Sequence, residues 1–113
     1  MHEMALCESI LQILEDEARK QRFNRVRVVR LEIGGLSHVE PEAMRFCFDA
    51  VTNGSLADGA KLEILQPAGL AYCMDCEAQV EIHQRYDPCP KCDGHKLQIV
   101  GGDEMKIKDL EVV

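Results

Sequence analysis

The stretch that decides the fold runs from Cys73 to Cys92 and reads CMDC, twelve further residues and CPKC. Each Cys-x-x-Cys pair spans a tight turn that aims both sulfurs the same way, so two pairs that fold together can place four thiolates around one tetrahedral ion. One pair alone is also typical of a redox disulfide, but a second pair after this gap is typical of a zinc ribbon. The sequence therefore predicts a zinc site formed by Cys73, Cys76, Cys89 and Cys92.

Four thiolates fill the coordination shell of zinc and leave no position for substrate or water, which predicts a structural site. Iron is the rival ion, because CPKCDG also resembles a rubredoxin knuckle. Pro90 is expected to rigidify the second turn and Gly94 to adopt a positive φ there. The lobe has few large apolar side chains, and zinc binding in finger-sized sites contributes roughly 10–16 kcal/mol. Metal removal is therefore expected to melt this lobe.

Composition excludes several other classes of protein. A net charge of −7 over 113 residues argues against a nucleic-acid partner, whose phosphates require a basic face. The first twenty residues hold five acids and no apolar run long enough for a signal peptide or a membrane span. A cytoplasmic protein without a membrane partner is expected, with reduced cysteines. Cys7 and Cys47, outside the two pairs, are expected to be small buried hydrophobes on helices.

The first half of the chain alternates between helical and strand patterns. A helix is predicted over 3–21, with an apolar stripe formed by Leu6, Ile10, Ile13 and Leu14. A β-branched run over 25–33 predicts a strand whose phase changes after Val28, which indicates a bulge or a strand covered on both faces. A second helix begins at Pro41 and ends near Asn53, with an inner stripe of Met44, Cys47, Phe48 and Val51.

The second half completes a mixed α+β fold. A strand over 61–66 closes a βαβ unit with parallel strands, and the first helix is expected to cover the same sheet. Short strands are predicted over 79–83 and 97–100, and the alternating tail over 105–113 is expected to return to the first sheet. The sequence thus predicts a small βαβ-containing sheet packed with two helices and an inserted zinc-ribbon lobe. The domain bounds are 1–68 with about 103–113, and 69–102.

No catalytic constellation is found, so the protein is not expected to be an enzyme. Ser9, Ser37 and Ser55 lack a nucleophile-elbow setting, and the glycine pair at 34–35 is too short for a phosphate loop. The histidines His38, His83 and His95 are interpreted as surface residues.

The amino terminus carries a second metal pattern. The amine of Met1, the ionised backbone nitrogen of His2 and its imidazole can form fused chelate rings around one ion, with Glu3 or another donor at a fourth position. Such planar nitrogen-rich sites select Ni(II) or Cu(II) over Zn(II). A frayed polar terminus is the alternative interpretation. Glu40 is a further candidate oxygen donor, against its interpretation as a helix-terminal carboxylate.

The chain resembles the HypA/HybF family of hydrogenase nickel-incorporation proteins. The resemblance rests on the initial Met-His-Glu-Met, on RVRVVRLEIGGLS at 25–37, on FCFD at 46–49, on GSLADG at 54–59 and on the two Cys-x-x-Cys pairs. It covers essentially the full length. The resemblance implies a metallochaperone that binds Ni(II) through Met1, His2 and Glu3 and holds structural Zn(II) through Cys73, Cys76, Cys89 and Cys92. Its implied partners are the GTPase HypB and the large subunit of [NiFe] hydrogenase.

Two other classes of protein are also compatible with the sequence. One is a zinc-ribbon module that binds protein or nucleic acid without nickel transfer. Another is a thiol oxidoreductase, which would need one exposed thiolate of depressed pKa. Neither rival explains the Met-His-Glu start. Both a monomer and a homodimer are compatible with the sequence.

Overall fold

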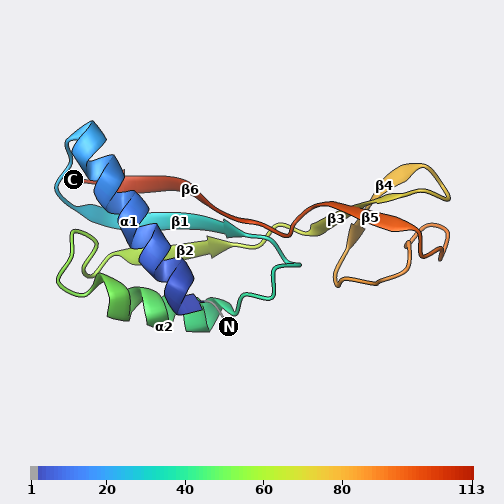
Figure 1. Cartoon of the computed structure of the whole chain (residues 1–113), viewed down its shortest axis with the longest axis horizontal. Helices are drawn as coiled ribbons and strands as arrows, with labels where there is room; N and C mark the ends of the chain where they lie inside the picture. Colours follow the sequence, from blue (N-terminus) through green and yellow to red (C-terminus); the bar gives the residue numbers. More distant parts are fainter. Residues whose placement is uncertain (1–2) are drawn as a thin grey trace. The chain divides into compact units, whose positions relative to one another are not determined.

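The computed structural model of the protein, in which residues 3–113 are described, has a mixed α+β architecture (Figure 1). Met1 and His2 lie outside the described residues. In chain order the elements are α1 (Glu3–Gln21), β1 (Val26–Ile33), α2 (Pro41–Thr52), β2 (Lys61–Leu65), β3 (Gly69–Cys73), β4 (Ala78–Ile82), β5 (Leu97–Gly101) and β6 (Met105–Val112). The strands form two three-stranded sheets, in the orders β2-β1-β6 and β4-β3-β5. The predicted fold class is confirmed.

The chain divides into two compact units. Unit 1 comprises the residues up to Leu31 together with Val39–Ile64 and Ile107–Val113. Unit 2 comprises Glu32–His38 and Leu65–Lys106. That the segments predicted as domains fold as separate bodies stays a prediction.

The first sheet contains the predicted βαβ unit. β1 and β2 are neighbours and run in the same direction, with α2 between them in the chain (Figure 1). β6 lies on the other side of β1 and runs in the opposite direction, and the backbone N–H of Val113 donates to the carbonyl of Arg25 at 2.9 Å. The prediction that the tail returns to the first sheet is therefore confirmed.

The two helices pack against each other in unit 1. In α1 the buried residues are Cys7, Ile10 and Leu14, whereas Ile13 is 47% exposed, so its predicted place on the stripe was wrong. Cys7, Ile10 and Leu14 are spaced three and four residues apart and therefore share one face of α1, whereas Ile13 lies at the side of that face. The Cys7 sulfur lies 3.5 Å from the carbonyl oxygen of Met44 on α2.

Helix α2 buries a narrower face than its sequence predicted. Met44, Phe48 and Thr52 are buried, whereas Cys47 and Val51 are only half-buried. The burial of Thr52 was not predicted because its hydroxyl group is polar. Its Oγ1 donates to the carbonyl of Phe48 at 2.7 Å, and this bond lets a polar side chain occupy the core.

Strand β1 is covered on one face by a core and on the other by an ionic cluster. Val29, Leu31 and Ile33 are buried in one phase, and Val26 is buried outside that phase. On the opposite phase, Arg30 bridges its two neighbouring strands through Glu63 of β2 at 3.0 Å, Asp109 of β6 at 2.7 Å, and Glu111 of β6. This cluster ties the three strands of the sheet together.

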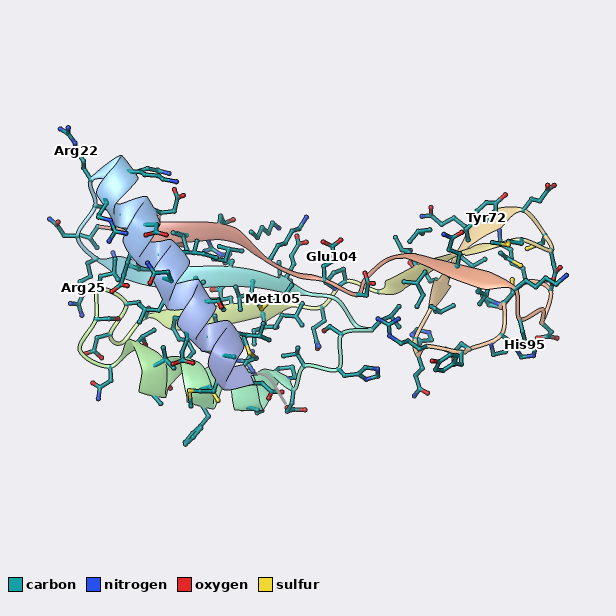
Figure 2. All side chains as sticks on the ribbon, viewed as in Figure 1. Arg22, Arg25, Tyr72, His95, Glu104 and Met105 are labelled. Carbon is teal, nitrogen blue, oxygen red and sulfur yellow. The ribbon has the colours of Figure 1, made fainter. Side chains whose placement is uncertain are left out.

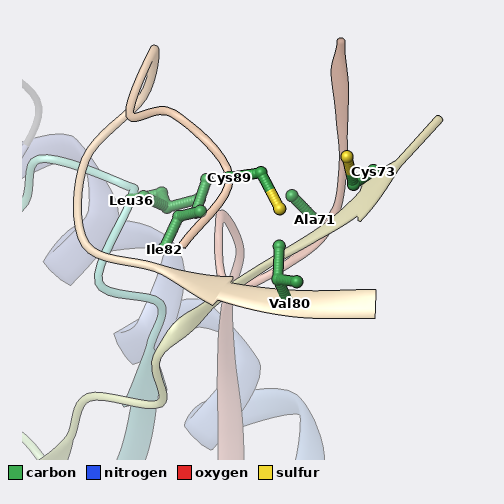
Figure 3. Packing of buried hydrophobic residues seen from close by; sticks show 6 residues of the cluster. All are labelled: Leu36, Ala71, Cys73, Val80, Ile82 and Cys89. Atoms are coloured by element: carbon green, nitrogen blue, oxygen red, sulfur yellow. The ribbon is translucent and has the colours of Figure 1, made fainter. Parts of the chain in front are cut away.

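Unit 2 is built around β3, a strand that the sequence pattern did not reveal. β3 pairs antiparallel with both β4 and β5, and its residues Ala71 and Cys73 are fully buried. The core cluster comprises Leu36, Ala71, Cys73, Val80, Ile82 and Cys89 (Figure 3). β3 opens with Gly69, where an added Cβ would lie 2.6 Å from the Leu36 side chain. Glycine and alanine are poor strand formers, so tertiary packing decides this strand.

Candidate metal centre

The four cysteines of the two Cys-x-x-Cys pairs meet in unit 2. Cys73 ends β3 and Cys76 lies in the turn before β4, while Cys89 and Cys92 come from the loop before β5. The sulfurs of Cys73 and Cys92 are 3.6 Å apart, those of Cys76 and Cys89 are 3.8 Å apart, and all four lie within 4.8 Å of one another. A tetrahedral ion with Zn–S bonds of about 2.3 Å requires sulfurs about 3.8 Å apart. The donor set therefore fits a tetrahedral thiolate-bound ion such as zinc.

The cage is partly enclosed by the core of unit 2. Cys73 and Cys89 are buried and belong to the core cluster, Cys76 is half-buried and Cys92 is exposed. Among residues 3–113, this is the only group of three or more histidine, cysteine or acidic side chains whose ligand atoms gather so closely. With all four positions taken by sulfur, the cage has no open coordination position for substrate.

The two cysteine turns share one backbone feature. The residue after the second cysteine of each pair is left-handed, with φ of 53° at Glu77 and 60° at Asp93. The prediction of a positive φ at Gly94 was wrong. Gly94 is needed for space instead, because an added Cβ would lie 2.5 Å from Oδ2 of Asp75 and 3.2 Å from the sulfur of Cys92.

Backbone donors favour the thiolate of Cys89. Burial raises the pKa of this thiol, but hydrogen bonds from the backbone N–H groups of Lys91 and Cys92, together with those from the side chains of Cys92 and Cys73, lower the pKa to about 7. The N–H of Lys91 lies 3.4 Å from the Cys89 sulfur. Hydrogen bonding to Cys73, together with burial, raises the pKa of Cys76 to about 12. The raised pKa values of Cys76 and Cys92 mean that these two thiols keep their protons unless a cation compensates the charge, so metal binding would release protons.

The predicted nickel ligands Met1 and His2 lie outside the described residues. Glu3 is the first residue of α1 and is half-buried. Its Oε2 accepts a 3.4 Å hydrogen bond from the backbone N–H of Glu40, which places the beginning of α1 beside the beginning of α2. The Glu40 side chain accepts from the N–H of Glu42 at 3.0 Å and caps α2, as its helix-terminal interpretation required. No sequence signal links Glu3 to Glu40, because 37 residues separate them.

The remaining histidines of the described chain are surface residues, as predicted. His38, His83 and His95 are all exposed. His95 lies on the loop that precedes β5 (Figure 2). No described helix is long and apolar enough to cross a membrane.

A closed four-sulfur cage on a small α+β scaffold fits the class of metal-binding proteins in which a bound ion supports the fold. The comparison with known families agrees with that class. The chain belongs to the HypA family, whose model, described as hydrogenase/urease nickel incorporation, metallochaperone, matches residues 1–112.

Curated relatives and solved structures extend the match to the whole chain. The chain is 60% identical over 112 residues to the hydrogenase maturation factor HypA 2 of Bradyrhizobium diazoefficiens and 62% identical to the hydrogenase maturation factor HypA of Rhodopseudomonas palustris, with 99% of each chain covered. The solution structure of the nickel metallochaperone HypA from Helicobacter pylori has a TM-score of 0.73 at 26% sequence identity, covering 100% of this chain and 98% of that one.

Proposed function

We propose that the protein carries Ni(II) at its amino terminus and delivers it to the large subunit of [NiFe] hydrogenase, without catalysing a reaction itself. The observation that carries the proposal is the family match, which extends over the Met-His-Glu start as well as both cysteine pairs. In this proposal the nickel ligands are the Met1 amine, the backbone and imidazole nitrogens of His2, and Glu3. Nitrogen-rich planar sites suit Ni(II) and discriminate against Zn(II).

The position of Glu3 supports an oxygen donor at this site. Its carboxylate lies at the beginning of α1, directly after the two proposed nitrogen ligands, and contacts the backbone of Glu40. Glu40 contributes a second carboxylate at the same end of unit 1. The two carboxylates make the electrostatic potential at this end of unit 1 more negative, which favours binding of a divalent cation. The terminal amine and the backbone amide must lose protons to bind that cation. An amine of ordinary pKa near 8 makes nickel affinity fall as the pH decreases.

The cysteine cage is proposed to hold a structural zinc ion through Cys73, Cys76, Cys89 and Cys92. These four thiolates would fill the coordination shell of a zinc ion, which would join the turn after β3 to the loop before β5. The four sulfur positions and the enclosure of Cys73 and Cys89 support this role. The nickel cargo would thus bind nitrogen and oxygen donors, whereas the structural zinc ion would bind sulfur donors.

The proposed partners follow from the same family role. They are the nickel-handling GTPase HypB, which would cooperate in delivery, and the hydrogenase large subunit, which would receive the ion. The proposed location is the cytoplasm, and the proposed assembly is a monomer or a homodimer. A nucleic-acid partner is not part of the proposal, because the chain carries a net charge of −7.

The proposal is tested by blocking the terminal amine. A glycine added before Met1 is expected to abolish tight Ni(II) binding in calorimetric titration, and His2→Ala is expected to do the same. The matched control carries a glycine after Val113 and should bind nickel like the native chain. Zinc content, measured on each sample, should not change. Unchanged nickel affinity in both amino-terminal variants would contradict the terminal site.

A further inference from the structure

Each of the two packed helices of unit 1 carries a Met-x-x-Cys pair near its beginning. The pairs are Met4 with Cys7 on α1 and Met44 with Cys47 on α2. Residues three apart share one face of a helix, so the two sulfur-bearing side chains of each pair lie on the same side of their helix. Because α1 and α2 pack together and their beginnings lie side by side, the two pairs come from adjoining turns (Figure 1).

Two of these sulfurs already have the spacing of ligands that share one ion. The Sγ of Cys7 lies 4.0 Å from the Sδ of Met44. An ion that binds sulfur at about 2.3 Å in a trigonal plane holds its donors about 4 Å apart. Burial and, after it, the nearby Cys47 thiol raise the pKa of Cys7 to about 11, so a third sulfur is close to this pair.

The group of sulfurs extends from the core of unit 1 to its surface. Cys7 and Met44 are fully buried, Cys47 is half-buried, and Met4 is 40% exposed. The buried pair is thus shielded from water, while Cys47 gives an ion a route from solvent to it. The proposed nickel site and the zinc cage use none of these four side chains.

The chemistry of the donors favours one kind of ion. Thiolate and thioether sulfur are soft ligands, and together they suit Cu(I). Zinc is bound in proteins by cysteine, histidine and carboxylate groups, and planar nitrogen-rich sites select Ni(II) or Cu(II). The thioether of Met44 therefore distinguishes this group from the four-thiolate cage and from the proposed nickel site.

We propose that Cys7, Cys47 and Met44 form a binding site for a soft monovalent metal ion, Cu(I), which would bridge α1 and α2. Cys7 and Cys47 would each lose a proton to solvent and bind as thiolates, whereas Met44 would bind as a neutral thioether. The bound ion would link the two helices near their beginnings. This proposal goes beyond nickel delivery and does not depend on it.

The test is an anaerobic titration of the full-length, zinc-loaded protein with Cu(I), supplied as its bicinchoninate complex. The protein is labelled with ¹³C in its methionine methyl groups and followed by NMR. A saturable shift is expected at Met44, which would support the site whether or not the cage also responds. Met74, next to Cys73, reports binding at the cage, and Met105 on β6 should not shift. Shifts confined to Met74 with release of zinc, or confined to Met1, would overturn the proposal.

Variants separate coordination from a general effect on the helices. Cys47→Ser, at a half-buried position, should lower the Cu(I) affinity at least about 100-fold in competition with bicinchoninate, and Met44→Leu about tenfold. Leucine fills nearly the volume of methionine without its sulfur, so this variant keeps the packing of the core. Met105→Leu is the matched control and should bind like the native chain.

Two further measurements on the metal-free variants keep the result interpretable. Amide protection in α1 and α2 shows that the helices are intact, and zinc content shows that the cage is unchanged. Equal Cu(I) affinities for the native chain, Cys47→Ser and Met44→Leu would overturn the proposal. So would a loss in Met105→Leu as large as that in Met44→Leu.

Discussion

At the scale of single residues, Gly94 shows how closely the cysteine turns are packed. We predict that Gly94→Ala weakens zinc binding by about 1–3 kcal/mol, since the new methyl group would press on the Asp75 carboxylate and the Cys92 sulfur. Competition with a chromophoric chelator measures the change. Gly101→Ala is the matched control, because its Cβ would meet nothing closer than 3.5 Å. Equal zinc affinities for Gly94→Ala and the native chain would contradict the packing argument.

Cys7 gives a pH prediction in unit 1. Burial, followed by the nearby Cys47 and Glu3, raises the pKa of the Cys7 thiol from its ordinary 9.0 to about 11. The folded state therefore retains this proton after the unfolded chain has lost it, and stability should fall as the pH rises from 9 to 11. Below pH 9 the thiol is neutral in both states and contributes no slope.

Urea unfolding across this pH range measures the effect, with Cys7→Ala as comparison. The alanine variant lacks the titrating group, so its stability should depend less steeply on alkaline pH, whatever its absolute stability. Identical slopes would show that the Cys7 thiol titrates alike in the folded and unfolded chains.

At the scale of elements, the Arg30 cluster is expected to hold β1 between β2 and β6. Arg30→Met would leave Glu63, Asp109 and Glu111 facing one another without their shared cation, so the melting temperature should decrease. Added salt screens this repulsion, and the difference from the native chain should shrink in high salt. Arg27→Met, an exposed position on the same strand, is the control. A deficit that salt does not change would indicate lost packing instead.

The sequence was sufficient to predict some of the helices and strands but not others. The bounds of α1 and the strand character of β6 followed from periodicity, because their patterns are long and regular. β3 was not predicted because Gly69 and Ala71 have low strand propensity. They form a strand because β3 pairs with β4 on one side and with β5 on the other. The burial of Thr52 was not predicted for a related reason, because it depends on one hydrogen bond to the carbonyl of Phe48.

The cysteine cage was foreseeable and its details were not. Ligand spacing predicted the gathering of the four sulfurs, which the structure shows. The left-handed residues Glu77 and Asp93 could not be read from residue type, since glycine was the expected carrier of a positive φ. Contacts between distant segments, such as Glu3 with Glu40, leave no local pattern in a single sequence.

At the scale of the whole molecule, the two donor sets lead to a prediction about metal removal. The cage ties together the segments of unit 2, whose core is small and includes Cys73 and Cys89 themselves. Unit 1 has its own core of helix and strand residues, formed among others by Ile10, Leu14 and Phe48. Chelation of zinc should therefore unfold unit 2 and leave unit 1 folded.

Amide hydrogen exchange measures this directly. After chelation, protection should be lost in β3, β4 and β5 and retained in α1 and α2, and Cys76→Ser should reproduce the pattern. Cys47→Ser, outside the cage, is the control and should keep both zinc and protection. Nickel titration of the zinc-free protein should still show terminal binding, because none of the proposed nickel ligands lies in unit 2. Simultaneous loss of protection in α1 and α2 would mean that the bound ion stabilises the whole chain, which would contradict the expected independence of unit 1.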